Sequence, residues 1–283
     1  MIALQVTISM LSMVIQNCLF NTSCKKELPT NNHLFRFNIV MYAICIIVFG
    51  ATIFIGGISL YTVLIGLVFG VVLALSNLYK MMALSNGPMH ITILITTSSM
   101  IIPTMSGIFF GESFSLPKLL FVAILIWFIY LSLGKSSDKK INKRWLLFSS
   151  LAFVFQGTVG VLQKIHQTSS HKGEANALLF VAFTCSLIYN RIRAKKTFAE
   201  LNFTKKHIIF ALICGACAYT MNVLNLRLSG LLPSQLFFPL VNGSSIVLTS
   251  LISVLFFKER ITKTQAVGLI GGILSLIAIC IVK

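Results

Sequence analysis

The residue types that most often perform catalysis are few in this sequence, and they do not cluster. All six acidic residues fall in loops or at the ends of apolar segments: Glu27, Glu112, Asp138, Glu174, Glu200 and Glu259. The five histidines are scattered, at His33, His90, His166, His171 and His207. Membrane-embedded lipid-modifying enzymes need paired acids, clustered histidines or a metal set. Such an enzyme is therefore a remote alternative, and we expect no catalytic residue, no metal site and no cofactor.

Two cysteines have a spacing that is used in redox chemistry. Cys214 and Cys217 form a C-x-x-C pattern, which supports thiol–disulfide exchange when it lies near a β–α–β unit. Here the pair lies in an apolar segment with no strand pattern around it. We therefore expect both cysteines to pack as small hydrophobic side chains.

Uncharged polar residues inside apolar segments are better candidates for chemistry, and that chemistry is ligand binding. Amides are costly to bury in lipid unless they find a partner or line water. Serine is a weaker candidate, because it often joins neighbouring helices. The candidate substrate-binding residues of this kind are four amides and two hydroxyls: Asn77, Gln156, Asn222, Asn242, Ser98 and Ser245.

Three basic residues lie near the ends of apolar segments, at Lys80, Lys164 and Arg227. Long basic side chains usually extend to the membrane interface. The alternative is that they meet a carboxylate or phosphate of a substrate. We include Lys80 and Arg227 among the candidate substrate-binding residues.

The segments that must position these residues are suited to a membrane rather than to water. The chain has 283 residues, 57% of them apolar, and only 10% are charged, against about 25% in soluble domains. A membrane helix needs roughly 20 apolar residues. The segments that meet this requirement lie at about 1–20, 35–55, 58–79, 90–110, 117–134, 145–164, 175–190, 207–226, 233–256 and 265–282. They are apolar on every face, which predicts an all-α membrane protein with ten transmembrane helices and no barrel.

The basic residues indicate how such a protein is oriented. The chain has 23 basic and 6 acidic residues, an excess that in a soluble protein would suggest a nucleic-acid partner. Here the basic residues lie between apolar segments, and ten spans would put 18 of the 23 on one side. The positive-inside rule makes that side cytoplasmic and places both termini outside. We expect contact with membrane lipid and no nucleic-acid partner.

The second half of the chain repeats the first. One segment runs from Pro88 to Glu112 and a later one from Pro233 to Glu259, separated by 24 and 26 residues, and each is followed by one more apolar segment. We predict a first repeat at 1–134, a basic linker at 135–144 and a second repeat at 145–283. Because each repeat has an odd number of spans, five, the second is inverted relative to the first. Inverted repeats are typical of secondary transporters, whose substrate site lies between the halves.

The repeated motifs also resemble a known family. They comprise Leu84-Ser-Asn-Gly-Pro88, Ile102-Pro103, Phe110-Gly-Glu112, Phe238-Pro239, Asn242-Gly-Ser-Ser245, Phe257-Lys-Glu-Arg260 and the closing Val267-Gly-Leu-Ile-Gly-Gly-Ile. In order and spacing they resemble the drug/metabolite transporter superfamily, EamA-like branch, over almost the whole chain. The resemblance implies two inverted five-helix halves around a central cavity, alternating access, and export of amino acids and related compounds. It also implies cytoplasmic termini, opposite to the charge distribution, so the sidedness stays open.

Four further residues are candidates for hinge or structural roles. Pro103 and Pro239 lie within spans, where proline removes a backbone hydrogen bond, and we expect the span around Pro239 to be locally irregular. Glu112 and Glu259 occupy matching positions in the two halves. An acid near the start of the next helix would offset that helix's dipole.

The absence of an intramembrane acid narrows the function. Small multidrug resistance pumps of the same superfamily exchange protons for cationic drugs through a midplane glutamate, and this chain has none. We therefore expect a secondary transporter, an exporter, of a small neutral, zwitterionic or anionic metabolite such as an amino acid. The alternatives are a carrier of lipid-linked or nucleotide-linked sugar and a non-transporting sensor. We expect a monomer or homodimer that is integral to a bacterial cell membrane, with its basic loops in the cytoplasm.

Overall fold

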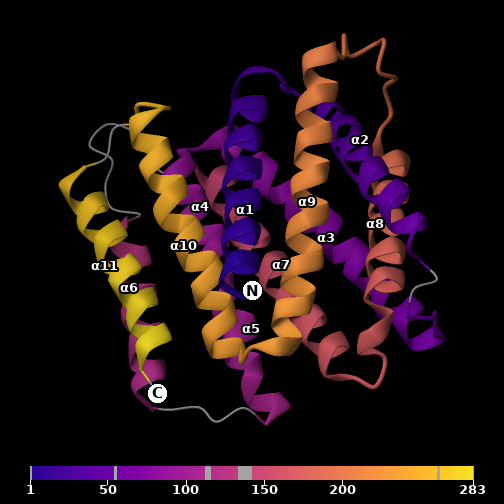
Figure 1. Ribbon diagram of the computed structural model, residues 1–283. Coiled ribbons are helices and arrows are strands. Elements are labelled where there is room, and N and C mark those ends of the chain that lie inside the picture. The colour runs from indigo at the N-terminus through magenta and orange to yellow at the C-terminus, as the bar shows by residue number, and fades with distance from the viewer. Residues whose placement is uncertain (1, 54–55, 112–115, 133–141, 260–261, 283) are drawn as a thin grey trace.

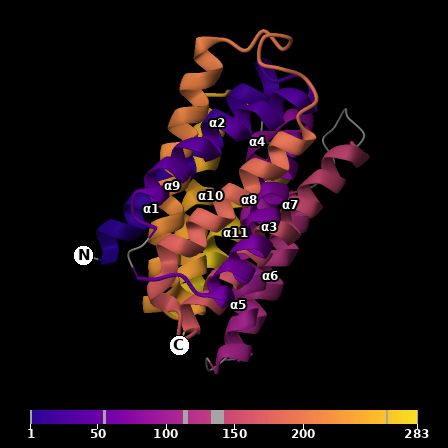
Figure 2. The same cartoon turned by 90° about the vertical axis from the view of Figure 1, so that its right-hand side faces the viewer.

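The computed structural model describes residues 2–53, 56–111, 116–132, 142–259 and 262–282, and every regular element in these ranges is a helix. Figure 1 shows the helices as a bundle in which consecutive helices run up and down between two ends. The view turned by 90° shows the same alternation (Figure 2).

The helices of the first half include one that is broken into short pieces. The elements are α1 (Ile2–Lys26), α2 (Asn31–Gly50), α3 (Leu60–Asn86), α4 (Met89–Thr97), η1 (Ser98–Met100), α5 (Ile101–Ser106), η2 (Gly107–Phe110) and α6 (Leu116–Ser132). The segments η1 and η2 are 3₁₀ turns that continue the path of α4 and α5.

The described helices of the second half include none that is broken into short pieces. They are α7 (Lys143–Thr168), the 3₁₀ turn η3 (Lys172–Glu174), α8 (Ala175–Arg193), α9 (Lys205–Leu231), α10 (Ser234–Leu255) and α11 (Lys263–Ile281). Several begin with a side-chain cap. Thr204 with His207 and Thr262 with Gln265 form capping boxes at α9 and α11, in which each residue of the pair satisfies a free backbone N–H of the other.

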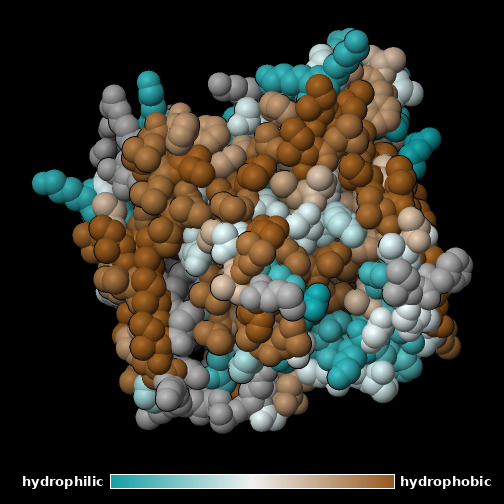
Figure 3. Space-filling model, viewed as in Figure 1, coloured by the Kyte–Doolittle hydropathy of each residue, from teal (hydrophilic) through white to brown (hydrophobic). Residues whose placement is uncertain are grey.

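Eight segments of the described chain are long and apolar enough to cross a membrane: α1, α2, α3, the broken helix Met89–Phe110, α7, η3 with α8, α9 and α10. The remaining two helices, α6 and α11, pack against each other at one edge of the bundle. Figure 3 shows hydrophobic residues over much of one side, with hydrophilic residues mainly towards the two ends. An exposed apolar side of this extent is what lipid requires and water does not tolerate.

Most helices extend beyond the apolar segments that predict them. The helix expected to end near residue 79 continues to Asn86, and the first continues to Lys26. Polar residues at these ends still form helical hydrogen bonds, so hydropathy underestimates the length. The second helix is shorter than expected and ends at Gly50, ahead of Gly56 and Gly57, whose positive φ angles no helix contains.

Helices from the two halves pack against each other along most of their length. Helix α3 contacts α7 and α8, α1 contacts α9, and α2 contacts α8 and α9. Gly66 and Gly70 lie on the face of α3 that meets α8, and a Cβ atom at Gly70 would come within 2.4 Å of the Ala182 backbone oxygen. The G-x-x-x-G pair thus permits a close helix contact.

The two prolines have different effects on their helices. Pro103 is the third residue of α5, which begins directly after the 3₁₀ turn η1. Pro239 lies inside α10, which continues without a break from Ser234 to Leu255. The prediction of an irregular span around Pro239 is therefore wrong. Pro239 lies in the second turn of α10, where it removes a single backbone hydrogen bond, and the rest of the helix tolerates that loss.

Candidate functional site

A cavity of about 60 Å³ lies inside the bundle, between helices of both halves. Helices α1 and α3, the turn η1 and α5 contribute to it from the first half, and α7, α9 and α10 from the second. Its polar lining residues are Gln16, Ser76, Asn77, Lys80, Ser99, Gln156, Gln163, Asn222, Asn225 and Asn242. Met13, Met100, Phe237 and Phe238 are among the apolar residues that complete the wall.

Small residues let the helices come close around this cavity. On α7, Gly157 faces Ile102 and Gly160 faces Pro103, and in both places a Cβ atom would lie within 2.7 Å of the neighbouring side chain. Close packing of α7 on α5 brings Gln156 and Gln163, two turns apart on α7, to the same wall. The glycines thus determine how near the amides of α7 come to the broken helix.

Three asparagines of the cavity use their NH₂ groups within the protein. Asn77 donates to the Tyr42 hydroxyl at 2.8 Å, whereas Asn222 and Asn242 donate to backbone oxygens one helical turn earlier, at 2.8 and 2.9 Å. A carbonyl oxygen only accepts, so the orientation of these last two amides is fixed by chemistry. Within the described chain, the side-chain oxygens of all three asparagines accept no hydrogen bond, which leaves them available to a ligand that donates.

Other amides of the cavity have the opposite arrangement. The Gln156 oxygen accepts from Ser76 at 3.2 Å, and the Asn225 oxygen accepts from Ser9 at 2.5 Å. In the described part of the chain their NH₂ groups make no hydrogen bond, so these are the free ends of the two amides. The cavity thus offers both acceptors and donors, and none of its described lining residues is acidic.

The cavity brings together some of the residues that the sequence predicts and not others. Asn77, Gln156, Asn222, Asn242, Lys80 and Pro103 line it. Ser98 and Ser245 are buried outside it, since their hydroxyls donate to the backbone oxygens of Leu94 and Asn242. Arg227 is exposed and Pro239 is buried, both away from the cavity. Glu112 lies outside the described residues.

Sequence reasoning did not select five of the polar lining residues, although helical spacing could have found two of them. Asn225 follows Asn222 by three residues and Gln163 follows Gln156 by seven, whereas Ser76 and Ser99 only adjoin the candidates Asn77 and Ser98. Residues three, four or seven apart share a helix face. Gln16 of α1 had no such partner; it donates to the Cys214 backbone oxygen at 3.2 Å.

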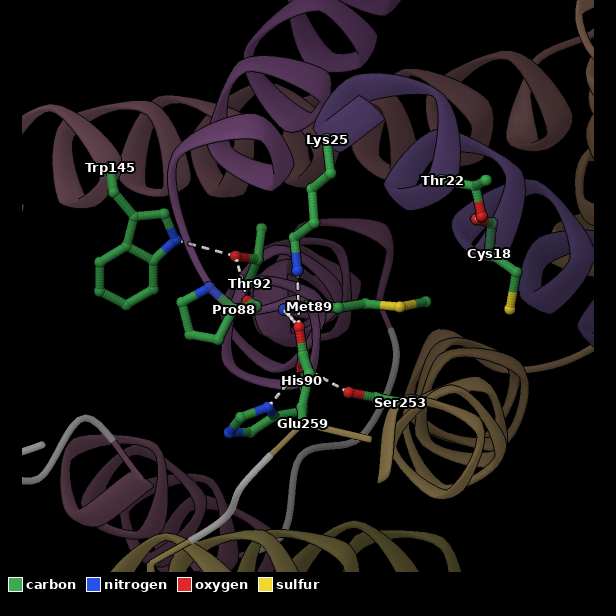
Figure 4. A network of polar contacts seen from close by, with 10 residues as sticks. All are labelled: Cys18, Thr22, Lys25, Pro88, Met89, His90, Thr92, Trp145, Ser253 and Glu259. Carbon is green, nitrogen blue, oxygen red and sulfur yellow. Dashed lines mark hydrogen bonds and ion pairs between the residues drawn. The ribbon is translucent and has the colours of Figure 1, made fainter. Parts of the chain in front are cut away.

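A second polar site surrounds Glu259 at the end of the bundle where α1 ends and α4 begins (Figure 4). The Glu259 carboxylate accepts from Lys25 of α1 at 2.7 Å, from the His90 ring at 2.8 Å and from Ser253 of α10 at 2.5 Å. It also accepts from the backbone N–H groups of Met89 and His90, at 2.9 and 3.2 Å. We call these five residues the Glu259 cluster. The carboxylate thus caps α4, a helix of the other half, and not the next helix α11 as the sequence suggests.

The electrostatics of Glu259 follow from these contacts. Only 12% of its side chain is exposed, and burial alone would raise the pKa of the carboxyl group. The hydrogen bonds from His90, Lys25, Met89 and Ser253 outweigh burial and hold that pKa well below its usual range. Glu259 is therefore a charged and largely buried helix cap.

The basic loops meet at the same end of the bundle. Glu27, after α1, pairs with Lys206 at the start of α9, and Arg36 of α2 donates to the Lys196 backbone oxygen at 2.7 Å. Asn32 accepts from the backbone N–H of Lys195 at 2.9 Å. These contacts join the loops after α1 and α8 at one end of the bundle. The positive-inside argument depends on these basic loops lying on the same side.

The fold and the cavity define the class of protein: an integral, multi-pass helical membrane protein with a polar cavity between helices of its two halves. Residues 143–281 match the model of the EamA-like transporter family. The second half of the chain thus matches a family of membrane transporters within the drug/metabolite transporter superfamily, and this match confirms the resemblance seen in the sequence.

Comparison with solved structures supports the fold. One crystal structure shares 11% sequence identity with this chain, with 96% of each chain covered and a TM-score of 0.64. At this identity the likeness shows the fold alone. No curated protein matches the chain.

Proposed function

We propose that the protein is a secondary transporter that exports a small neutral, zwitterionic or anionic metabolite, such as an amino acid, by alternating access. The observation that carries this proposal is the cavity, which is lined by uncharged amides from both halves of the chain. Amides with unused hydrogen-bonding atoms are costly in a membrane interior unless they bind water or a ligand. No described residue of the cavity could exchange a proton as a carboxylate.

The architecture in this proposal has ten spans in two inverted halves, residues 1–134 and 145–283, joined by the linker 135–144. Helices α6 and α11 then form the last span of each half, and their mutual packing is consistent with equivalent positions. The cavity between the halves would be the fixed site around which they rock.

The size of the cavity favours a small substrate. One water needs about 10–15 Å³, so about 60 Å³ holds four to six groups of that size. A nucleotide-linked or lipid-linked sugar would require the helices to move much further apart. We therefore keep the sugar carrier as the alternative and the small metabolite as the proposal.

The Glu259 cluster would close one end of the transport path. It joins α1 and α4 of the first half to α10 and its following loop in the second, so rocking of the halves must separate its members. Ser99 lies nine residues beyond His90, roughly 14 Å along the helix, so the cluster lies well beyond the cavity, towards the basic end. With the basic loops in the cytoplasm, this conformation is closed on the cytoplasmic side.

Flux measurements on purified protein in liposomes test the proposal. We expect Asn222→Leu and Asn77→Leu to reduce transport at least tenfold, because each removes the only acceptor atom that the residue offers the cavity. Asn86→Leu, on the exposed end of α3, is the matched control and should transport normally. Normal flux through correctly inserted Asn222→Leu and Asn77→Leu would contradict the assignment of the cavity.

A further inference from the structure

Lys80 is a buried basic residue in the wall of the cavity. It lies on α3, is 4% exposed, and sits six residues before the end of the helix, roughly 9 Å from it. In the described part of the chain its ammonium group makes no hydrogen bond or ion pair with the protein. Its own helix, Leu60–Asn86, contains no acidic residue that could pair with it.

The other two basic residues near span ends have different environments. The Lys164 ammonium, also buried, donates to the Ser229 backbone oxygen at 3.1 Å. Arg227 is exposed and does not line the cavity. Of the three candidates that the sequence could not separate, Lys80 alone faces the cavity, and its ammonium group has no hydrogen-bond or ion-pair partner among the described residues.

An unpaired charge in this position is expensive for the fold. Ionised groups in membrane interiors are costly and are usually paired, and those that persist generally serve a function. The cost of burying a cation is offset only when an anion or several acceptors approach it. Among the described residues that line the cavity, no carboxylate is available to do so.

We propose that Lys80 is an oxyanion subsite that selects substrates with one carboxylate or phosphate group. This inference rests on the proposed transport function and narrows its substrate class, since it removes neutral metabolites. The NH₂ group of Gln156 is available as a second donor to the oxyanion, because its oxygen is held by Ser76. The oxygens of Asn77, Asn222 and Asn242 then accept from N–H or O–H groups on the rest of the ligand.

Stability without ligand gives a first test that needs no knowledge of the substrate. If Lys80 is kept for binding, its removal relieves a buried charge, so Lys80→Met and Lys80→Gln should unfold in detergent at or above the wild-type temperature. A structural lysine would behave in the opposite way. A fall of about 5 °C or more in both variants, several kcal/mol for a chain of this length, would overturn the proposal.

Binding of minimal anions gives the second test. Acetate and inorganic phosphate are small enough for the cavity and represent the two oxyanion types, acetamide is the neutral match of acetate, and sodium chloride controls ionic strength. We expect acetate or phosphate to raise the unfolding temperature by about 2 °C at saturating concentration, and acetamide to have no effect. Whichever anion gives the larger shift distinguishes a carboxylate from a phosphate substrate.

The variants identify the residue responsible. The shift should disappear in Lys80→Gln, persist in Lys80→Arg because the positive charge is restored, and persist in Arg227→Gln. An equal shift in Lys80→Gln, an equal effect of acetamide, or no shift with either anion would overturn the proposal.

Flux separates this inference from the function on which it rests. Transport of a neutral solute that Lys80→Gln leaves unchanged would overturn the oxyanion subsite and keep the transporter. Anion binding that depends on Lys80, without any flux of organic anions in liposomes, would keep the subsite and contradict transport.

Discussion

Replacement of Glu259 by glutamine tests how much the Glu259 cluster stabilises the protein. Five donors converge on the carboxylate, two on one oxygen and three on the other. Glutamine keeps one acceptor oxygen and turns an NH₂ group towards the remaining donors. If the NH₂ replaces the less crowded oxygen, the Lys25 ammonium and the Met89 N–H lose their acceptor.

The expected magnitude follows from those two lost contacts. A partly buried donor left without an acceptor costs about 1–3 kcal/mol, so Glu259→Gln should lower the free energy of unfolding by about 3 kcal/mol. An unfolding entropy near 2 cal/mol/K per residue, over 283 residues, converts this into a fall of about 5 °C in the unfolding temperature.

The assay is thermal unfolding of detergent-purified protein, with Glu200→Gln as the matched control. Glu200 also holds a backbone N–H, that of Thr197, but in an exposed loop. We expect little change in that variant. A Glu259→Gln protein that unfolds within 1 °C of wild type would refute the reasoning. It would mean that hydrogen bonds from these donors to water stabilise the protein as much as those to the carboxylate.

The same assay has a defined pH dependence. The pKa of Glu259 is lower in the folded protein than its usual value near 4.3. A depressed folded pKa contributes stability above the unfolded pKa, and that stability is lost as the pH falls towards the folded value. The difference between wild type and Glu259→Gln should therefore be constant from pH 7 to about 5 and shrink below about 4.3.

Two further predictions concern packing and orientation. Gly70→Ala should lower the free energy of unfolding by about 1–3 kcal/mol, because its Cβ atom would meet the Ala182 backbone; Gly173→Ala, with open space around it, should unfold like wild type, and equal stability of both variants would contradict the close α3–α8 contact. Glu200→Cys, in the loop after α8, should react with a membrane-impermeant maleimide only after the cells are permeabilised, and labelling in intact cells would reverse the proposed orientation.

The sequence predicts the helices and the cavity amides for the same physical reason. Hydropathy and the cost of burying an amide are both local properties, and Asn77, Gln156, Asn222 and Asn242 line the cavity. Ser98 and Ser245 differ because a helical hydroxyl can satisfy itself on a backbone oxygen of the preceding turn. No sequence pattern states which of these two outcomes a serine adopts.

The partner of Glu259 could not be read from the sequence either. Its position after α10 suggests a cap for the next helix, and the acid does cap a helix, but one that begins 170 residues earlier, at Met89. The loop after α10 returns across the bundle to the other half, and periodicity contains no information on that path. In the same way, the sequence does not separate Lys80, which faces the cavity, from Lys164, whose ammonium group donates to a backbone oxygen. Only the packing of the seven segments around the cavity distinguishes the two lysines.

Helix α4 connects the Glu259 cluster to the cavity. Its first residues, Met89 and His90, are held by Glu259, and η1, at its other end, contributes Ser99 and Met100 to the cavity wall. Between them the helix is continuous, whereas beyond them the 3₁₀ turn and Pro103 interrupt regular α geometry. In the proposed mechanism, a ligand that moves η1 acts on a continuous helix whose opposite end closes the basic side. Such a ligand favours opening only if it binds the open form more tightly than the closed form. An anion site around Lys80 that is complete only after the halves have rocked would supply this difference in affinity.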